Sequence, residues 1–270
     1  MDAGLLEKLI TAKTKAIVPV HYGGIACDMD KIMSLALTYK LAVVEDAAQA
    51  IDSYYRNKPL GSIGHLAAFS FHETKNVIAG EGGMLVINDE KYFKRAEIIR
   101  EKGTNRSAFF RGEVAKYNWV DLRSSFLPSE ITSAFLFAQL EHLDTIQAKR
   151  KKIWNTYYQA LLPLEKEGKI KLPFIPDYAS NNAHLFYILC SDLETRSGLI
   201  DHLNREGILS VFHYLSLHKS PFYLSQKDAV RTELPNSDYY SDHLLRLPFY
   251  YELEDMDLER IIGAMKKFFG

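Results

Sequence analysis

The first part of the chain alternates between short apolar runs and a helical pattern. Residues 16–20, 41–44, 66–71 and 83–87 are apolar runs of the length typical of buried strands. From Asp28 onward, apolar side chains recur at intervals of three and four residues, which predicts a helix. Strands that are apolar throughout need cover on both faces, so the pattern predicts an α/β fold whose sheet is flanked by helices.

The middle of the chain predicts more helix than strand. A charged helix is expected over residues 89–102, followed over 103–125 by an ordered loop rich in Arg, Ser, Asn and aromatic side chains. Pro128 suits the first turn of a long helix that runs to about Leu161 and stops at Pro163. We therefore expect one long helix to connect two regions of the chain.

A boundary is predicted where Pro173 and Pro176 interrupt the pattern. It separates a major domain, residues 1–170, which includes the long helix, from a smaller C-terminal α/β domain, residues 171–270. Within the smaller domain we expect a strand, a helix and a second strand over residues 184–190, 195–206 and 208–214, and then a long loop. The apolar side chains of the last helix share one face, as a core-facing helix requires: Leu258, Ile261, Ile262, Met265, Phe268 and Phe269.

The composition is that of a globular protein with balanced charge. Lysine and arginine total 33 and aspartate and glutamate 34, giving a formal net charge of -1, and no basic stripe indicates nucleic-acid binding. Cys27 and Cys190 lie far apart without a C-x-x-C pair, which argues against a disulfide scaffold and a metal site. No apolar run is long enough to span a membrane, and residues 1–15 lack a signal-peptide pattern, so we expect a cytoplasmic protein.

Asp46 stands where the apolar strand over residues 41–44 is predicted to end. Ligands of open α/β sheets bind at the carboxyl ends of the strands, and a carboxylate there can pair with a buried cation. On position alone, the simpler interpretation is that Asp46 caps the element that follows it.

Lys75 follows the predicted strand over residues 66–71 and precedes a loop of small residues, 79–83. An amine that forms Schiff bases must be partly desolvated, which lowers its pKa and exposes its lone pair to the reacting carbonyl. A loop at a strand end, packed against glycines, provides such surroundings. The alternative is a solvated surface lysine.

Three polar neighbours of Lys75 each have two interpretations. Ser70 either donates to a phosphate or is a buried serine bonded to a nearby carbonyl. His72 is either a base or a packed, hydrogen-bonded residue, and Glu73 is either a substrate contact or a surface charge. Composition and spacing alone therefore give a candidate site whose chemistry stays open.

Several strings of residues closely resemble the DegT-type sugar aminotransferases, which are fold-type-I enzymes that use pyridoxal 5'-phosphate (PLP) and act on nucleotide-linked keto sugars. The strings extend over essentially the whole chain: residues 44–49, 69–76, 80–83, 98–106, 212–214 and 245–248. Phe-His-Glu-Thr-Lys-Asn and Lys-Gly-Thr-Asn-Arg-Ser are most similar to the dTDP-4-amino-4,6-dideoxygalactose transaminase branch. The resemblance implies a mixed sheet flanked by helices and a smaller C-terminal α/β domain.

Carried over to this chain, the resemblance implies that PLP is the cofactor and that Lys75 forms the covalent link to it and moves the proton during transfer. Asp46 would pair with the pyridinium nitrogen and keep it protonated. Gln49 would bond near the phenolic oxygen of the ring, where many relatives carry histidine, and Ser70 would donate to the phosphate. Ser125 lies where the family has an asparagine that reaches a partner subunit's cofactor, which implies a homodimer.

For the substrates, the resemblance implies a nucleotide-linked 4-keto-6-deoxy sugar, dTDP-linked, with glutamate as the amino donor. Arg106, His213 and Tyr214 are candidates for contacting the nucleotide sugar or its phosphates. Some relatives are sugar dehydratases that carry histidine at the lysine position, so Lys75 favours transamination. Because the resemblance begins well inside the family pattern, the alternative is a noncatalytic remnant that binds only a ligand or a partner chain.

Overall fold

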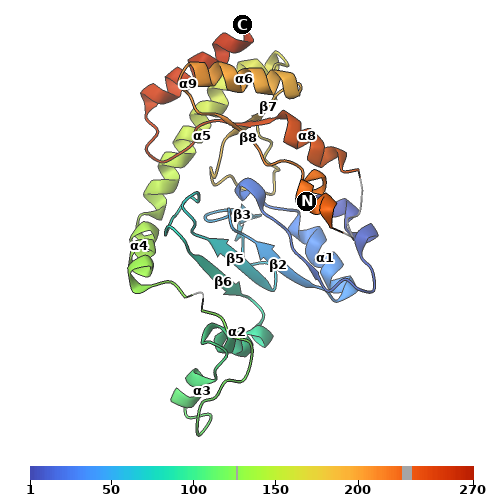
Figure 1. The fold of residues 1–270 in the computed structure, drawn as a ribbon, viewed down its shortest axis with the longest axis vertical. Coiled ribbons are helices and arrows are strands. Elements are labelled where there is room, and N and C mark those ends of the chain that lie inside the picture. Colours follow the sequence, from blue (N-terminus) through green and yellow to red (C-terminus); the bar gives the residue numbers. More distant parts are fainter. Residues whose placement is uncertain (126, 227–232) are drawn as a thin grey trace. The chain divides into compact units, whose positions relative to one another are not determined.

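The computed structural model (Figure 1) describes residues 1–125, 127–226 and 233–270. These residues form two compact units, each built from two stretches of the chain. Unit 1 contains residues 1–147 and 176–184, and unit 2 contains residues 148–175 and 185–270. We describe each unit by itself.

The predicted division into domains at residue 170 stays a prediction. The two compact units divide the chain at other positions. Residues 148–175 group with unit 2, and residues 176–184 return to unit 1. The return is made by contacts that are distant in sequence, such as the bond between Asn182 and Asn76, 106 positions earlier. Pattern analysis does not detect contacts of this range.

A four-stranded mixed sheet lies at the centre of unit 1, in the order β1-β2-β5-β6 (Figure 1). Strands β1, β2 and β5 run parallel, and β6 runs antiparallel to β5. A separate antiparallel hairpin pairs β3 with β4. The bounds are β1 (Ala16–Ile17), β2 (Ala42–Asp46), β3 (Tyr54–Tyr55), β4 (Lys58–Pro59), β5 (Leu66–Ser70) and β6 (Gly83–Ile87). The predicted α/β class is confirmed.

The register of this sheet brings polar residues to one edge. Asp46, the last residue of β2, pairs with Ala68 of β5, and Ser70 at the end of β5 pairs with Gly83. Downstream of β1, the His21 N–H donates to the Asp46 carbonyl at 3.0 Å. Because parallel strands end at the same edge of a sheet, these residues share the edge at which ligands bind in α/β folds.

Helix α1 (Met29–Tyr39) begins where the sequence predicts. Asp28 is its N-cap, and the carboxylate accepts the Lys31 N–H at 3.4 Å. The side chains of Met29, Ile32 and Ala36 are buried in the core of unit 1, and α1 packs against β1 and β2. One flank of the sheet therefore receives the helix cover that the apolar strands require.

Unit 1 contains further helices, and one of them lies where a loop was expected. The expectation of a loop over residues 103–125 is wrong at α3, which the Glu101 carboxylate stabilises by accepting the backbone N–H of Ser107 at 3.0 Å. The bounds are η1 (Ala3–Leu5), η2 (Glu7–Leu9), η3 (Tyr22–Gly24), η4 (Glu90–Tyr92), α2 (Phe93–Arg100), α3 (Arg106–Phe110) and α4 (Glu130–Glu141), where η marks a 3₁₀ helix.

The single long helix predicted from Pro128 is wrong at its start and in its continuity. Helix α4 begins after Ser129, whose hydroxyl accepts the Thr132 N–H at 3.2 Å. A second helix, α5 (Leu143–Lys166), follows after a break at His142, where the backbone leaves the helical conformation. The break does not interrupt the apolar pattern, so the sequence indicates one helix where the chain makes two.

Pro163 lies inside α5 and does not end it. A proline within a helix removes one backbone hydrogen bond and strains the preceding turn. Leu161 and Leu164, on either side of it, are buried. Their burial favours the helical path and offsets part of that cost, so the helix continues to Lys166.

Unit 2 contains an antiparallel sheet in the order β7-β9-β8. The predicted last helix is confirmed, with Leu258, Ile261, Ile262 and Met265 buried. The long loop expected after Tyr214 contains short helices, and residues 227–232 of it lie outside the described residues. The bounds are β7 (Tyr187–Leu189), β8 (Val211–Phe212), β9 (Leu244–Arg246), α6 (Leu193–Arg205), η5 (Leu217–Lys219), α7 (Pro221–Ser225), α8 (Pro235–His243) and α9 (Asp255–Phe269).

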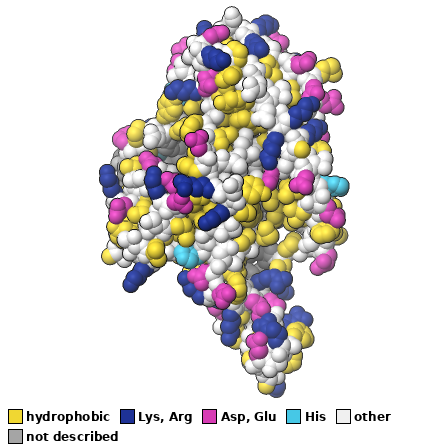
Figure 2. Space-filling view, turned by 180° about the vertical axis from the view of Figure 1, so that it is seen from behind, with side chains coloured by type: hydrophobic (Ala, Val, Ile, Leu, Met, Phe, Trp, Pro, Cys, Tyr) yellow, Lys and Arg dark blue, Asp and Glu magenta, His cyan; other side chains and the backbone are white. Residues whose placement is uncertain are grey.

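The surface carries charges of both signs. Figure 2 shows one face of the molecule, on which cationic and anionic side chains are interspersed and hydrophobic side chains gather in places. Among the described helices, none combines the length and the apolar character that crossing a membrane requires.

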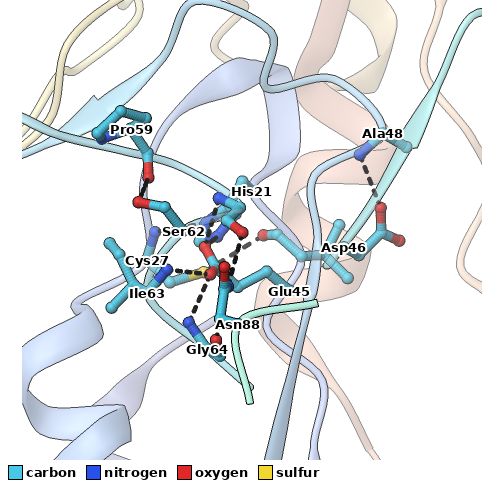
Figure 3. Close-up of polar contacts among 12 residues, drawn as sticks. His21, Cys27, Glu45, Asp46, Ala48, Pro59, Ser62, Ile63, Gly64 and Asn88 are labelled. Carbon is cyan, nitrogen blue, oxygen red and sulfur yellow. Dashed lines mark hydrogen bonds and ion pairs between the residues drawn. The ribbon is translucent and has the colours of Figure 1, made fainter. Parts of the chain in front are cut away.

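Glu45 is a fully buried carboxylate next to Asp46 on β2 (Figure 3). Its Oε1 accepts the backbone N–H groups of Ile63 at 2.8 Å and Gly64 at 2.6 Å. Its Oε2 accepts the Gly61 N–H at 2.8 Å and bonds to His21 Nε2 at 3.0 Å. Each oxygen thus has two donors, which compensates the loss of water around a buried charge.

The hydrogen bonds around His21 indicate which of its ring nitrogens carries a proton. Its Nδ1 accepts the Cys27 N–H at 3.2 Å, which assigns a proton to Nε2, and this proton is donated to Glu45. Burial by itself raises the pKa of Glu45, but the hydrogen bonds from His21 and from three backbone N–H groups outweigh burial and lower it. Glu45 is therefore ionised, and its charge holds the loop over residues 61–64 against β2.

We expect Glu45→Gln to lower the free energy of unfolding at pH 7 by about 2–4 kcal/mol, because the amide nitrogen would face two N–H donors. The pKa of Glu45 is lowered in the folded protein, so the stability it contributes is present above its ordinary value of 4.5 and is lost as pH falls through the folded pKa. The difference between wild type and variant, measured by urea unfolding, should therefore shrink below about pH 4.5.

The matched control for that experiment is Glu81→Gln. The Glu81 side chain is 87% exposed, so its substitution should change the free energy of unfolding by less than about 0.5 kcal/mol. Equal effects of the two substitutions would contradict the role assigned to Glu45.

Candidate active site

Asp46 and Glu45 point to opposite sides of β2, as neighbouring residues of a strand do (Figure 3). The Asp46 backbone is held by the bond from its N–H to the Pro19 carbonyl at 2.9 Å. Its Oδ1 accepts the Ala48 N–H at 3.1 Å, which closes a local turn. The capping interpretation of Asp46 is thus present in the structure. A carboxylate has about four lone-pair positions, so one such bond is compatible with a ligand contact as well.

Lys75 lies in the turn between β5 and β6 and is half-buried. Its backbone N–H donates to the His72 carbonyl at 2.9 Å. Burial lowers the pKa of the Lys75 amine, and the charge of Asp46 partly opposes that effect. The structure therefore brings the amine and the carboxylate within electrostatic reach of one another, although they are 29 positions apart (75 minus 46) in the sequence.

Backbone hydrogen bonds join the two ends of the connection between β5 and β6. The Phe71 N–H donates to the Gly82 carbonyl at 2.8 Å, and the Ala79 N–H donates to the Phe71 carbonyl at 2.7 Å. The Phe71 side chain is 1% exposed and Val77 is fully buried. These contacts confine Lys75 to a short turn whose ends are packed in the core.

Gln49 lies in the loop that follows Asp46. Its side-chain Oε1 accepts the Gly23 N–H at 2.6 Å, so the loop after β1 fixes the orientation of this amide. Gly23 belongs to the 3₁₀ helix η3, and its φ of +64° is one that glycine adopts without steric cost. The end of β1 thus positions a residue that follows β2.

Ser70 and its neighbours complete the turn. The Ser70 hydroxyl oxygen accepts the His72 N–H at 3.3 Å, at the same sheet edge as Asp46. The His72 ring bonds to Thr74 within the turn, with Nδ1 accepting the Thr74 N–H at 3.3 Å. Glu73 is exposed. The local roles weighed for His72 and Glu73, a hydrogen-bonded residue and a surface charge, match what the structure shows.

Sequence reasoning missed Asn76, the residue after Lys75, and the residues to which its side chain bonds. Asn76 is 5% exposed, and its side chain bonds to Gln147 at 2.9 Å, to the Asn182 carbonyl at 2.8 Å and to His184 at 2.8 Å. A polar residue beside a candidate lysine is the one signal that could have pointed to Asn76. Its partners carry no such signal.

The remaining predicted residues are not gathered around Lys75 by any described contact. Arg106 is the exposed first residue of α3, with its guanidinium 5.2 Å from the centre of the Phe110 ring. Ser125 is exposed. His213 and Tyr214 belong to unit 2, where their rings lie 5.0 Å apart.

Neither a surface hollow nor a metal site competes with this sheet edge among the described residues. A surface hollow of about 550 Å³ is lined by residues of the loop that Glu45 holds and by Met33, Asn88, Asp89 and Glu90, and it includes none of the predicted site residues. Within residues 1–125, 127–226 and 233–270, no group of three His, Cys, Asp or Glu side chains could hold a metal ion.

The donor set at the sheet edge suits PLP. A carboxylate at a strand end can pair with a protonated ring nitrogen, and an amine with a lowered pKa can condense with an aldehyde. A hydroxyl at the end of the neighbouring strand can donate to a phosphate. Asp46 and Ser70 supply the carboxylate and the hydroxyl from the ends of the neighbouring strands β2 and β5, and Lys75 supplies the amine from the turn after β5.

Comparison with known proteins identifies the family. The model of the DegT/DnrJ/EryC1/StrS aminotransferase family matches residues 1–266. The spore coat polysaccharide biosynthesis protein SpsC of Bacillus subtilis strain 168 is 33% identical over 273 residues, which cover 98% of this chain and 69% of SpsC.

Solved structures agree with this match. Helicobacter pylori PseC, described as an aminotransferase involved in the biosynthesis of pseudoaminic acid, has a TM-score of 0.88 at 25% identity, covering 100% of this chain and 70% of PseC. Spr1654 of Streptococcus pneumoniae in its PLP form has a TM-score of 0.86 at 26% identity, covering 99% of this chain and 71% of that protein. The chain therefore belongs to the DegT/DnrJ/EryC1/StrS aminotransferase family, whose cofactor is PLP.

Proposed function

We propose that this chain transfers the amino group of glutamate to a nucleotide-linked 4-keto-6-deoxy sugar, with dTDP as the nucleotide, in the cytoplasm. The observation that carries the proposal is the half-buried Lys75 amine, whose pKa burial lowers, within electrostatic reach of Asp46. The named relatives favour a sugar product, since one is a spore coat polysaccharide protein and another is involved in pseudoaminic acid biosynthesis. Cys27 and Cys190, both unpaired and buried, fit a reducing compartment.

In this proposal, each residue of the sheet edge has a separate task. When bound, PLP supplies an electron sink for the carbon from which a proton is removed. Lys75 would form the covalent link to the cofactor and, once released from it, its amine would take that proton and return it to the carbon that receives it. Asp46 keeps a proton on the ring nitrogen, Gln49 orients the ring, and Ser70 donates to the phosphate.

The substrate residues proposed in unit 2 come from the family resemblance. Burial first, and the positive charge of Arg246 second, lower the pKa of His213 to about 4, so its ring is neutral at pH 7 and acts through hydrogen bonds. Tyr214 is 72% exposed, with the Arg246 guanidinium 5.9 Å from its ring centre. On the resemblance, we assign His213 and Tyr214 to the sugar nucleotide. The same resemblance makes Arg106 a candidate for a phosphate contact, which its cation suits.

A homodimer is part of the proposal because helix α4 lacks cover. None of its residues is buried, although the helix is rich in apolar side chains. Ile131 is 85% exposed, Phe137 62% and Phe135 49%. Thr132, Ser133, Leu136 and Gln139 are partly buried, so one face of α4 is partly covered and exposed apolar side chains remain on the rest. Exposed apolar side chains gathered on one helix are typical of an interaction surface. Ser125, five residues before α4, would then donate to the partner subunit's cofactor.

The alternative function is binding without catalysis, by a chain that keeps the fold but not the reaction. The two functions differ in whether amino sugar is formed, because both allow the sugar nucleotide to bind. Lys75 separates them, since a binding protein does not need an amine of lowered pKa at this edge.

We expect the purified chain, given PLP, glutamate and a dTDP-linked 4-keto-6-deoxy sugar, to release 2-oxoglutarate and the amino sugar in equal amounts. Lys75→Ala should lower the rate by roughly 10²–10⁴-fold or more, since it removes the group that moves the proton. Mass spectrometry of the sugar and a coupled assay for 2-oxoglutarate measure the two products.

The matched control is Lys94→Ala, which removes an exposed lysine from α2 and should leave the rate unchanged. If wild type forms no amino sugar while calorimetry still detects bound sugar nucleotide, the enzyme proposal fails and the binding alternative is favoured.

We expect the chain to sediment as a dimer and Phe137→Glu to sediment as a monomer with unchanged helical circular dichroism, because a buried unpaired carboxylate opposes association. Leu37→Glu on α1, where the side chain is 82% exposed, is the control and should leave the dimer intact. A wild-type monomer, or a dimer that survives Phe137→Glu, contradicts the assignment of α4 as the interface.

A further inference from the structure

The segment over residues 176–184 contributes one fully buried polar residue to unit 1, Asn182. Its side-chain Nδ2 donates to two carbonyls of the loop after β2, those of Gln49 at 2.7 Å and Ile51 at 2.8 Å. That loop begins directly after Asp46. Asn182 therefore holds the path of the chain that leaves the Asp46 carboxylate.

The same residue also holds the turn that carries Lys75. The Asn182 carbonyl accepts the Asn76 side-chain Nδ2 at 2.8 Å and the Gln147 side-chain Nε2 at 3.1 Å. Asn76 is the next residue after Lys75. One residue thus connects, through its side chain and its backbone, the two loops that present Asp46 and Lys75.

Two further residues complete this group, which we call the Asn182 cluster: Asn76, Gln147, Asn182 and His184. The second Nδ2 proton of Asn76 goes to Gln147 Oε1 at 2.9 Å, and Asn76 Oδ1 bonds to His184 Nδ1 at 2.8 Å. Gln147 Nε2 also donates to Asp52 at 3.1 Å. Both amide protons of each of the three amide side chains are therefore used.

The cluster is confined as well as bonded. Gly24 packs directly against it, because a Cβ added at Gly24 would lie 2.0 Å from Asn182 Oδ1. The four members are each 9% exposed or less. In such surroundings a hydrogen bond is stronger than in water and a lost partner is costly, so the cluster has one arrangement that satisfies it.

We propose that the Asn182 cluster is a positioning device that sets the distance and orientation of the Lys75 amine relative to the Asp46 carboxylate. The bonds of Asn182 reach the backbone of the loop after Asp46 and the side chain of Asn76, the residue next to Lys75. The inference rests on the proposed roles of Lys75 and Asp46. It explains why a segment far along the chain returns to unit 1 and why its buried residue is an amide, which both donates and accepts.

The consequence for catalysis is a loss of rate rather than of substrate affinity. A displacement of about 1 Å in a catalytic group costs on the order of 10²-fold in rate. Asn76→Ala and Asn182→Ala should therefore lower kcat by roughly that factor. The KM for the sugar nucleotide should stay near the wild-type value, because the cluster includes none of the assigned substrate residues.

The test compares Asn76→Ala and the milder Asn76→Ser with Tyr157→Phe in the PLP-loaded protein. Tyr157 is also fully buried, and its hydroxyl donates to the Pro248 carbonyl at 2.9 Å, but it belongs to unit 2. We would measure kcat, KM, the free energy of unfolding and the pH midpoint of the Lys75-dependent absorbance of bound PLP. The Asn76 variants should lose kcat and shift the midpoint, and Tyr157→Phe should do neither.

The outcomes separate this inference from the function on which it rests. If wild type shows no Lys75-dependent absorbance, the proposed function fails. If wild type shows it and a folded Asn76 variant keeps both kcat and the pH midpoint, the positioning role fails while the function stands. If neither Asn76 variant folds, the cluster is a stability element and the positioning role is likewise overturned.

Discussion

The buried, ionised Glu45 is the interaction on which the rest of unit 1 depends. It is fully buried, and its four hydrogen bonds come from His21 and from the loop over residues 61–64. They join the ends of β1 and β2 to the segment that leads into β5. Because side chains alternate along a strand, fixing Glu45 on one side of β2 also fixes Asp46 on the other. The geometry of the candidate active site therefore depends on the Glu45 carboxylate, which has no role in the proposed reaction.

The strands of the β1-β2-β5-β6 sheet, α1 and α9 could be predicted because apolar runs or a local period mark them, whereas β3, β4 and β9 were not predicted. Asp46 and Lys75 were candidates because they follow predicted strands, and their proposed roles come from the family resemblance. The role of Glu45 could not be predicted, since its partners are mostly backbone N–H groups of a loop, which leave no trace in residue type. The Asn182 cluster could not be predicted for another reason, which is that its bonds connect residues up to 133 positions apart in the sequence. The break at His142 was hidden because the apolar pattern continues across it.

Two levels of support hold the site together, and they differ in kind. The Glu45 network depends on a charge, so it weakens in acid as that carboxylate gains a proton. The Asn182 cluster is built from amides and one histidine, and it acts on the loops beyond the strands. The register of a sheet fixes which residues lie at its edge. The loops that follow the strands fix the direction in which the functional groups of these residues point. Family membership accounts for the cofactor, and these two networks account for how this chain presents its residues to it.

Lys75 is proposed to be the one lysine of the chain that holds PLP. Incubation with PLP, reduction with borohydride, proteolysis and mass spectrometry of the peptides would identify the labelled lysine. We expect a pyridoxyl phosphate group on Lys75 alone, because burial lowers the pKa of its amine beside the Asp46 carboxylate. A label on a different lysine, or one spread evenly over the exposed lysines, would contradict it.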